Sequence, residues 1–286
     1  MNTELPPVCR HTPRFPRSLR RTQAGTIAET RNWRALHRSD IQREMAARSV
    51  RPRAILLDLD DTIIDYGGDV DATWRTVCAE AAQQVADLND AALVAAIHRV
   101  RRWYWSDPER HRVGRADLRA ASRWIVEQAL RSVGIDQPQL AHTIAEQYRD
   151  FRDARLSLFP GAVETLEHLR TLGCRLGMVT NGSSADQRAK IERFGLARYF
   201  HHILIEGEFG CGKPDTRVYQ AMLRTLDVAP HDAWFVGDNL EWDVAAPQRH
   251  GLFAIWVDTT RTGLPSDTPV RPQRIIHALS ELQGPD

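Results

Sequence analysis

Four apolar runs that each end in polar residues are the feature that most constrains how this chain can fold. They are AILLDLD at 54–60, RLGMVTNG at 175–182, AWFVGDN at 233–239 and FAIWVDT at 253–259. Short, nearly continuous apolar runs of this kind are typical of buried parallel strands. Helical spacing over 184–195, 215–227 and 241–250 separates the last three runs. The alternation predicts an α/β, Rossmann-like fold, with a parallel sheet covered by helices on both faces.

The segment between the first two runs has a different pattern, because every apolar repeat in it is helical. The repeats cover 69–88, 89–105, 115–134 and 138–154. We therefore predict an α-helical cap over residues 66–156, inserted into a core made of residues 51–65 and 157–286. Tyr66, with the two glycines that follow it, is the expected hinge. Ligands of parallel sheets bind beyond the carboxyl ends of the strands, so the cap would stand over the ligand site.

Residues 1–53 are strongly basic, with twelve arginines against four acidic residues and a local charge of +8. The rest of the chain must carry −7 to reach the total of +1. We expect residues 1–50 to be a disordered N-terminal extension, or translation to begin at Met45. The alternatives are a nucleic-acid-binding arm, a contact with an anionic membrane surface and an organelle-targeting peptide. No aromatic stacking pattern accompanies the arginines, so nucleic acid is not the expected partner.

Composition narrows the class of protein further. No stretch approaches the ~18 consecutive apolar residues of a membrane-spanning helix, and no compact apolar segment marks a secretory signal. A cytoplasmic protein without a membrane partner is predicted, as a monomer or a homodimer. The four cysteines lie far apart and lack the spacing of a zinc or redox motif, so we expect reduced thiols.

Carboxylates gather where the first and third runs end. Asp58 and Asp60 are two residues apart, so an extended backbone would point both in one direction and Asp61 in the other. Like carboxylates in a small site repel each other unless a cation neutralises them. Magnesium prefers a few carboxylates together with water and phosphate oxygens, so Asp58 and Asp238 predict an Mg²⁺ site. Aspartates after strands also cap helices or fill turns, and one of these residues alone would not support that prediction.

Four motifs strengthen the prediction because they occur in a set order. They are DLDDT (58–62), VTNG (179–182), GCGKP (210–214) and GDNLEWD (237–243). Together they resemble the motifs of the haloacid dehalogenase-like (HAD) hydrolase superfamily, over residues 54–260. A two-component receiver domain also uses aspartates, a hydroxyl residue and a lysine, but all its acidic residues precede the lysine. Here Asp238 and Asp243 follow Lys213.

The resemblance implies roles for the acidic residues. Asp58 would be the nucleophile that becomes an aspartyl phosphate. Asp60 would protonate the leaving group and then activate water as a general base. Asp238 would bind Mg²⁺ together with Asp58 and the backbone carbonyl of Asp60. Asp243 would support either the metal or the lysine.

The resemblance also implies a phosphate-binding group. Thr180 would hydrogen-bond the phosphoryl group with help from the backbone N–H groups of Asn181 and Gly182, and Lys213 would balance its charge. The chain has only two lysines, Lys190 and Lys213, against thirty-six arginines. A lysine kept at position 213 indicates that a compact ammonium is needed there. Lys190 lies on a predicted helix and is expected to be solvated surface.

These residues predict a magnesium-dependent phosphatase that acts on a small phosphorylated metabolite, of the nucleotide, flavin or sugar phosphate class. Haloalkanoic acid dehalogenases typically lack an aspartate at the position of Asp60. Phosphonoacetaldehyde hydrolases need a cap lysine, and residues 66–156 contain none. A sugar phosphomutase keeps both aspartates and stays open as an alternative. The alternative from another class is a non-catalytic protein that binds nucleic acid through its basic tail.

The arginines and aromatics of RVRRWYWSDPER (99–110) permit two interpretations. They could stack on and neutralise a nucleotide, flavin or sugar phosphate. The favoured interpretation is that Trp103 or Tyr104 packs inside the cap while the arginines face water.

Overall fold

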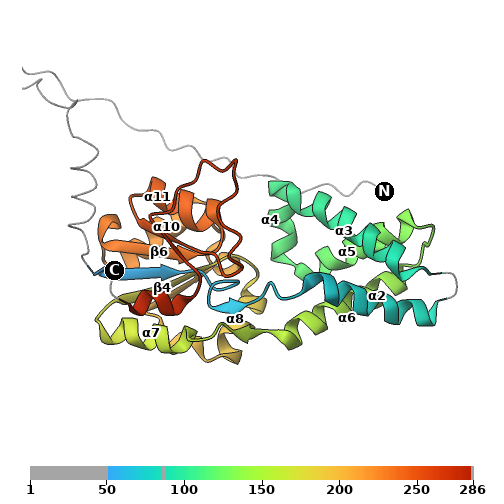
Figure 1. Ribbon diagram of the computed structural model, residues 1–286, viewed down its shortest axis with the longest axis horizontal. Helices are drawn as coiled ribbons and strands as arrows, with labels where there is room; N and C mark the ends of the chain where they lie inside the picture. The colour runs from blue at the N-terminus through green and yellow to red at the C-terminus, as the bar shows by residue number, and fades with distance from the viewer. Residues whose placement is uncertain (1–50, 86–87, 285–286) are drawn as a thin grey trace, which may run out of the picture. The chain divides into compact units, whose positions relative to one another are not determined.

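The computed structural model describes residues 51–85 and 88–284, which include a six-stranded parallel sheet, seen in the left half of Figure 1. Across the sheet the strands follow the order β5 (His202–Ile205), β4 (Arg175–Thr180), β1 (Ala54–Leu57), β6 (Ala233–Gly237), β7 (Phe253–Val257) and β8 (Arg274–Ile276). Every adjacent pair is parallel. The predicted α/β, Rossmann-like class is confirmed, and the sequence analysis missed β5 and β8. Because β1 lies between β4 and β6, three of the four motifs lie at the carboxyl ends of neighbouring strands.

Helices cover both faces of this sheet. Ile55 and Leu57 of β1 pack in one apolar cluster, with residues of α7 (Ala162–Thr171) and α8 (Ser184–Arg193). Ala54 and Leu56 pack in the opposite cluster, with residues of α10 (Thr216–Thr225) and α11 (Ala246–Arg249). In Figure 1, α7 lies on one side of the sheet and α10 and α11 on the other. A strand buried on both faces needs apolar residues at successive positions, which explains the continuous runs in the sequence.

Short elements complete the core. They are β2 (Ile64–Asp65), β3 (Ser157–Leu158), α9 (Glu206–Phe209), the 3₁₀ turns η1 (Leu196–Tyr199), η2 (Pro230–Asp232) and η4 (Leu279–Gln283), and the π-helical turn η3 (Leu240–Ala245). The helix predicted over 241–250 is thus divided into η3 and α11. Asn239 caps η3, since its side chain accepts hydrogen bonds from the backbone N–H groups of Glu241 and Trp242.

Between β2 and β3 lies a helical module, which we define as residues 70–155. Its described helices are α2 (Val70–Gln84), α3 (Asp90–Ser106), α4 (Pro108–Ala116), α5 (Leu118–Ser132) and α6 (Pro138–Arg155). Helices α2, α3, α5 and α6 share an apolar cluster, in which the rings of Trp74 and Tyr148 stack with centroids 3.6 Å apart. The chain enters and leaves the module through β2 and β3, which pair antiparallel. Tyr104 packs against this cluster, whereas Trp103 is 52% exposed.

The predictions about the N-terminal extension, the cysteines and membrane-spanning helices can be compared with the structure only in part. The basic extension at 1–50 lies outside the described residues, together with Cys9, so the predictions about it stay predictions. Cys78, Cys174 and Cys211 are free thiols. Among the helices of residues 51–85 and 88–284, none combines the length and the apolar character needed to cross a membrane.

Candidate active site

A cavity of about 290 Å³ opens at the carboxyl ends of β1, β4 and β6. It is lined by all the residues that the sequence analysis assigned to the site except Asp243, which lies directly behind Lys213. The core contributes Asp58, Asp60, Thr180, Asn181, Gly182, Lys213 and Asp238. The helical module contributes Trp105, His111, Arg115 and Leu118. Residues from five separate parts of the chain therefore meet around one space.

Lys213 lies at the floor of the cavity between two carboxylates. Its ammonium is 2.8 Å from Oδ1 of Asp58 and 2.7 Å from Oδ1 of Asp243, and its side chain is 1% exposed. Burial disfavours the charge on Lys213, but the two carboxylates outweigh burial and hold the pKa of the ammonium above its usual value. Asp58 also accepts a hydrogen bond from the N–H of Leu59 at Oδ1. Within residues 51–85 and 88–284, its Oδ2 accepts no hydrogen bond.

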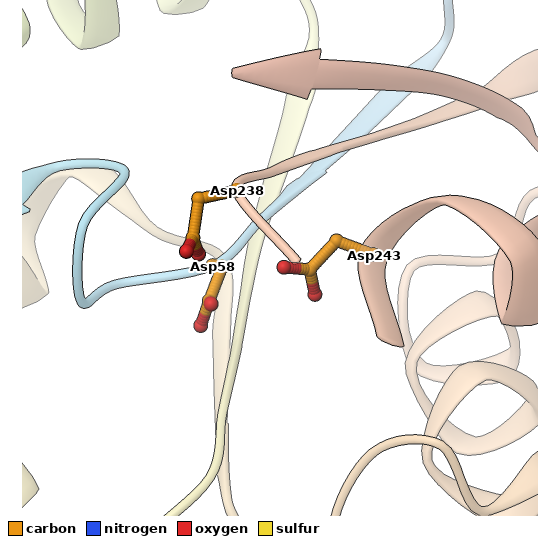
Figure 2. A group of neighbouring side chains, drawn as sticks. All are labelled: Asp58, Asp238 and Asp243. Atoms are coloured by element: carbon orange, nitrogen blue, oxygen red, sulfur yellow. The ribbon is translucent and has the colours of Figure 1, made fainter. Parts of the chain in front are cut away.

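Asp238 completes the acidic group with Asp58 and Asp243 (Figure 2). One carboxylate oxygen from each residue lies within 4.8 Å of the others. Burial raises the pKa of Asp238 to about 9, and repulsion from Asp243 and Asp58 adds to the effect. Burial likewise raises the pKa of Asp58 to about 7, although Lys213 opposes the rise. Three carboxylates around one ammonium leave excess negative charge, so the oxygen ligands fit a hard divalent cation such as Mg²⁺.

Asp243 has the most completely bonded carboxylate of the three. Its Oδ1 accepts from Lys213, and its Oδ2 accepts from the N–H of Asn239 at 3.0 Å. The residue is fully buried, and it approaches β6 closely because Gly237 has no side chain there. Of the two roles left open by the sequence, these contacts favour support of Lys213 over direct binding of a metal.

Strand β4 ends at Thr180, and the loop after it begins with Asn181 and Gly182; these three residues are the predicted phosphate-binding group. Thr180 is buried at the cavity wall. The side chain of Asn181 donates to the carbonyl of Lys213 at 2.8 Å and accepts from its N–H at 2.7 Å. The N–H of Gly182 donates to Glu206. The side chain of Asn181 thus holds the backbone of Lys213 in place. The N–H of Gly182, which is expected to help bind phosphate, already has a partner.

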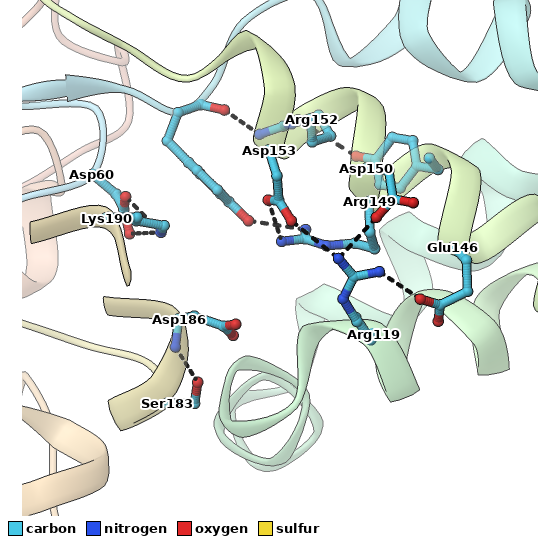
Figure 3. Close-up of polar contacts among 12 residues, drawn as sticks. Asp60, Arg119, Glu146, Arg149, Asp150, Arg152, Asp153, Ser183, Asp186 and Lys190 are labelled. Atoms are coloured by element: carbon cyan, nitrogen blue, oxygen red, sulfur yellow. Dashed lines mark hydrogen bonds and ion pairs between the residues drawn. The ribbon is translucent and has the colours of Figure 1, made fainter. Parts of the chain in front are cut away.

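The expectation that Lys190 is solvated surface is wrong. Its side chain is 6% exposed, and its ammonium lies 2.8 Å from both carboxylate oxygens of Asp60 (Figure 3). Gln187, one turn earlier on α8, donates to Oδ2 of Asp60 at 3.0 Å and to the hydroxyl of Thr180 at 2.5 Å. The sequence analysis did not name Gln187. The scarcity of lysine, which marked Lys213, was an equally good signal for Lys190.

Asp61 does not simply point away from the site, as strand alternation predicted. Strand β1 ends at Leu57, and the backbone turns at Asp61, where φ is +57°. Its carboxylate accepts hydrogen bonds from the N–H groups of Tyr66 and Gly67, and it borders the cavity. Asp61 therefore shapes the loop that leads toward the helical module.

The helical module meets the core through Arg115 and Glu206. Arg115 donates two hydrogen bonds of 2.7 Å to the carboxylate of Glu206, and both side chains are about one-seventh exposed. The guanidinium also lies 5.4 Å from the ring centroid of Trp242. His111 packs edge-to-face on the same ring. This part of the cavity is aromatic. Of the 99–110 segment, Trp105 lines the cavity, whereas Trp103 and Tyr104 do not.

Comparisons with known proteins define the class of this chain. Residues 52–251 match the family model described as haloacid dehalogenase-like hydrolase. The chain therefore belongs to this family and is a hydrolase, as the order of the motifs predicted.

Named relatives refine the comparison. The chain is 32% identical to a phosphoserine phosphatase of Thermus thermophilus, over 80% of this chain and 97% of that protein. It is 30% identical to a glyceraldehyde 3-phosphate phosphatase of Methanopyrus kandleri, over 71% of this chain and 82% of that protein. A HAD hydrolase of Bacillus subtilis, solved bound to magnesium, shares the fold with a TM-score of 0.62 and 23% identity, over 81% of this chain and 97% of that chain. Both curated relatives are thus phosphatases of this hydrolase family.

Proposed function

We propose that this hydrolase is a magnesium-dependent phosphatase of small phosphorylated metabolites that works through an aspartyl phosphate at Asp58. The observation that carries the proposal is the convergence of Asp58, Lys213, Asp238 and Asp60 around one cavity. Attack on a phosphate ester needs a nucleophile, positive charge for the phosphoryl group and an acid for the leaving oxygen. Each of these groups is present within the cavity.

Magnesium would be held by the carboxylates of Asp58 and Asp238 and by the backbone carbonyl of Asp60. When bound, it would offset the negative charge that keeps an anionic nucleophile and an anionic phosphate apart. Asp243 would hold Lys213 in place rather than act as a ligand, since both of its oxygens are already bonded.

In the first step, Oδ2 of Asp58 attacks phosphorus, and the bond between phosphorus and the ester oxygen breaks. Asp60 delivers a proton to that oxygen, so the alcohol leaves neutral. The ammonium of Lys213 stabilises the charge on the phosphoryl oxygens, and Thr180 donates its hydroxyl hydrogen to one of them. The product is a mixed anhydride on Asp58.

In the second step, Asp60 acts as a base. Its carboxylate takes a proton from a water molecule, whose oxygen attacks phosphorus. The bond between Asp58 and phosphorus breaks, inorganic phosphate forms, and Asp60 is again protonated. The helical module, with the hinge at Tyr66, would act as a cap that excludes bulk water and contacts the leaving group.

The aromatic part of the cavity supports a leaving group of modest size. Trp105 and Trp242 offer apolar surface, while Arg115 is already neutralised by Glu206. The named relatives act on phosphoserine and on glyceraldehyde 3-phosphate, so short phosphorylated metabolites are the first substrates to test.

The test is hydrolysis of p-nitrophenyl phosphate and of a panel of phosphorylated metabolites, with and without Mg²⁺. Asp58→Asn should lose at least about a thousandfold in kcat, because the amide is not a nucleophile. Asp227→Asn is the matched control: its side chain is 92% exposed, and its backbone φ of +50° suits asparagine. Full activity in Asp58→Asn, or hydrolysis that ignores Mg²⁺, would contradict the proposal. A sugar phosphate isomerised faster than it releases phosphate would point to the mutase instead.

A further inference from the structure

Lys190 and Gln187 form a second polar group beside the cavity, separate from Lys213. They are three residues apart on α8, so their side chains project from the same face of the helix. The ammonium of Lys190 contacts both oxygens of Asp60 and, at 2.9 Å, Oε1 of Gln187. The amide nitrogen of Gln187 donates to Asp60 and to Thr180. The four side chains form a continuous hydrogen-bonded network.

The burial of this network indicates that it is not an incidental surface contact. Gln187 is 2% exposed and Lys190 is 5% exposed. A buried ammonium is costly unless its hydrogen bonds are met. The face of the Tyr66 ring completes its surroundings, with the ammonium 4.0 Å from the ring centroid. Gln187 and the Tyr66 ring therefore flank the ammonium at the point where it contacts Asp60.

The direction of the hydrogen bonds matters for Thr180. Because the hydroxyl oxygen of Thr180 accepts from Gln187, its own hydrogen must point elsewhere. Within the part of the chain that the structure describes, its acceptor is the carbonyl of Asn181 at 3.5 Å, which is the limit of a hydrogen bond. The hydrogen is thus free to be donated to a phosphoryl oxygen in the cavity.

We propose that Lys190 and Gln187 are positioning residues of the reaction, with Lys190 holding the Asp60 carboxylate where it can take a proton from the attacking water and Gln187 orienting both Asp60 and the Thr180 hydroxyl. This inference rests on the proposed phosphatase function. Its main consequence concerns the second step, in which Asp60 must act as a carboxylate. The loss of Lys190 should then slow hydrolysis of the phosphorylated enzyme more than its formation.

p-Nitrophenyl phosphate separates the two steps, because nitrophenolate leaves with little help from an acid. In Lys190→Met, kcat should fall roughly tenfold to hundredfold while kcat/KM changes little. Phosphorylated enzyme should accumulate, so rapid mixing should show a burst of nitrophenolate close to one equivalent per site, larger than in the wild type. Lys190→Arg should recover part of kcat. In Gln187→Met, kcat and kcat/KM should both fall, since phosphate binding by Thr180 is also disturbed.

Arg188→Met is the matched control, because it also removes a cation from α8. The side chain of Arg188 is 47% exposed and pairs with Glu208. This variant should behave as the wild type. Thermal unfolding of each variant reports any general loss of folded protein, which would lower kcat and kcat/KM together without a burst. If Lys190→Met is folded and still shows this paired fall without a burst, the inference is wrong. Unchanged kinetics in Lys190→Met would also overturn it. If the wild type lacks magnesium-dependent hydrolysis, or Asp58→Asn retains it, the proposed function fails instead.

Discussion

The two lysines of this chain lie beside the same cavity, but their surroundings differ. Lys213 bridges Asp58 and Asp243, and the exposures of these three side chains are 1%, 12% and 0%. Lys190 pairs with Asp60, whose side chain is 24% exposed, and it faces the ring of Tyr66. All partners of Lys213 belong to the core, whereas Tyr66 connects the Lys190 region to the helical module.

Tyr66 makes that connection through the arginines of α6. Arg149 donates to its hydroxyl at 3.0 Å, and Arg152 donates to its backbone carbonyl while its guanidinium lies 4.7 Å from the ring centroid. The chain of contacts from α6 through Tyr66 to Lys190 therefore ends at Asp60. The comparison shows that Lys213 is held by carboxylates of the core, whereas Lys190 connects Asp60 to the helical module.

The largest effect should follow from Lys213→Met. Removal of this ammonium leaves Asp58 and Asp243 facing each other inside the core, and breaking such a buried pair costs about 3–5 kcal/mol of stability. Activity should fall roughly a thousandfold, because the phosphoryl group loses its charge partner. Chemical denaturation and hydrolysis assays measure the two losses. The same substitution at Lys190 should destabilise the fold less, and equal destabilisation would remove the distinction between the two regions.

Asp60→Asn tests the other side of the comparison. Turnover should fall by a factor of about a hundred or more, since general acid–base catalysis is lost. Stabilisation by Mg²⁺ should persist, because the proposed ligand at this position is a backbone carbonyl. Rapid-quench analysis of phosphorylated enzyme and thermal unfolding with Mg²⁺ measure these quantities. Normal turnover would exclude Asp60 from its assigned role.

Magnesium should raise the thermal stability of the protein by binding beside Lys213, at Asp58 and Asp238, and not beside Lys190. At a concentration a hundred times its Kd, a ligand that binds only the folded state adds about 2.7 kcal/mol to the free energy of unfolding. The melting temperature of the wild type should therefore rise with Mg²⁺ and return after chelation. Asp238→Asn should lose most of this shift, and an equal shift in the variant would place the ion elsewhere. Lys190→Met should keep the shift.

The smallest effect should follow from Tyr66→Leu, which separates the Lys190 region from α6. The ring faces three cations, of which Lys190 and Arg152 are the nearer and Arg149 lies 6.0 Å from the ring centroid. Such a contact contributes about 0.5–1 kcal/mol at a partly exposed site. We expect a two- to fivefold change in kcat or KM, given about 1 kcal/mol of lost contact, with unaltered stabilisation by Mg²⁺. Tyr66→Phe keeps the ring and should stay near the wild type. A loss as large as that of Asp60→Asn would show that Tyr66 acts directly in the reaction.

Local patterns were enough to predict four of the six strands of the sheet and the convergence of most candidate site residues on one cavity. The run at 54–57 is strand-like because both faces of β1 are buried, and helical spacing is visible over α8 and α10 without tertiary information. The short edge strand β5 was missed because it is only four residues long. Its first two residues, His202 and Ile203, are exposed and half-buried, so it lacks a continuous buried run. The π-helical start of the segment after β6 was missed because it depends on how Asn239 and Asp243 bond to the backbone.

The amino-acid sequence was enough to predict the class of fold, the order of the chemical groups and the need for a compact ammonium at position 213. These follow from periodicity and residue type, which act over a few positions along the chain. Three contacts became visible only once the chain was folded. Lys190 pairs with Asp60 across 130 residues of chain, Glu206 accepts from the N–H of Gly182, and Asp243 is bonded at both oxygens. Such partners are chosen by how strands and helices pack, and no local pattern encodes that packing.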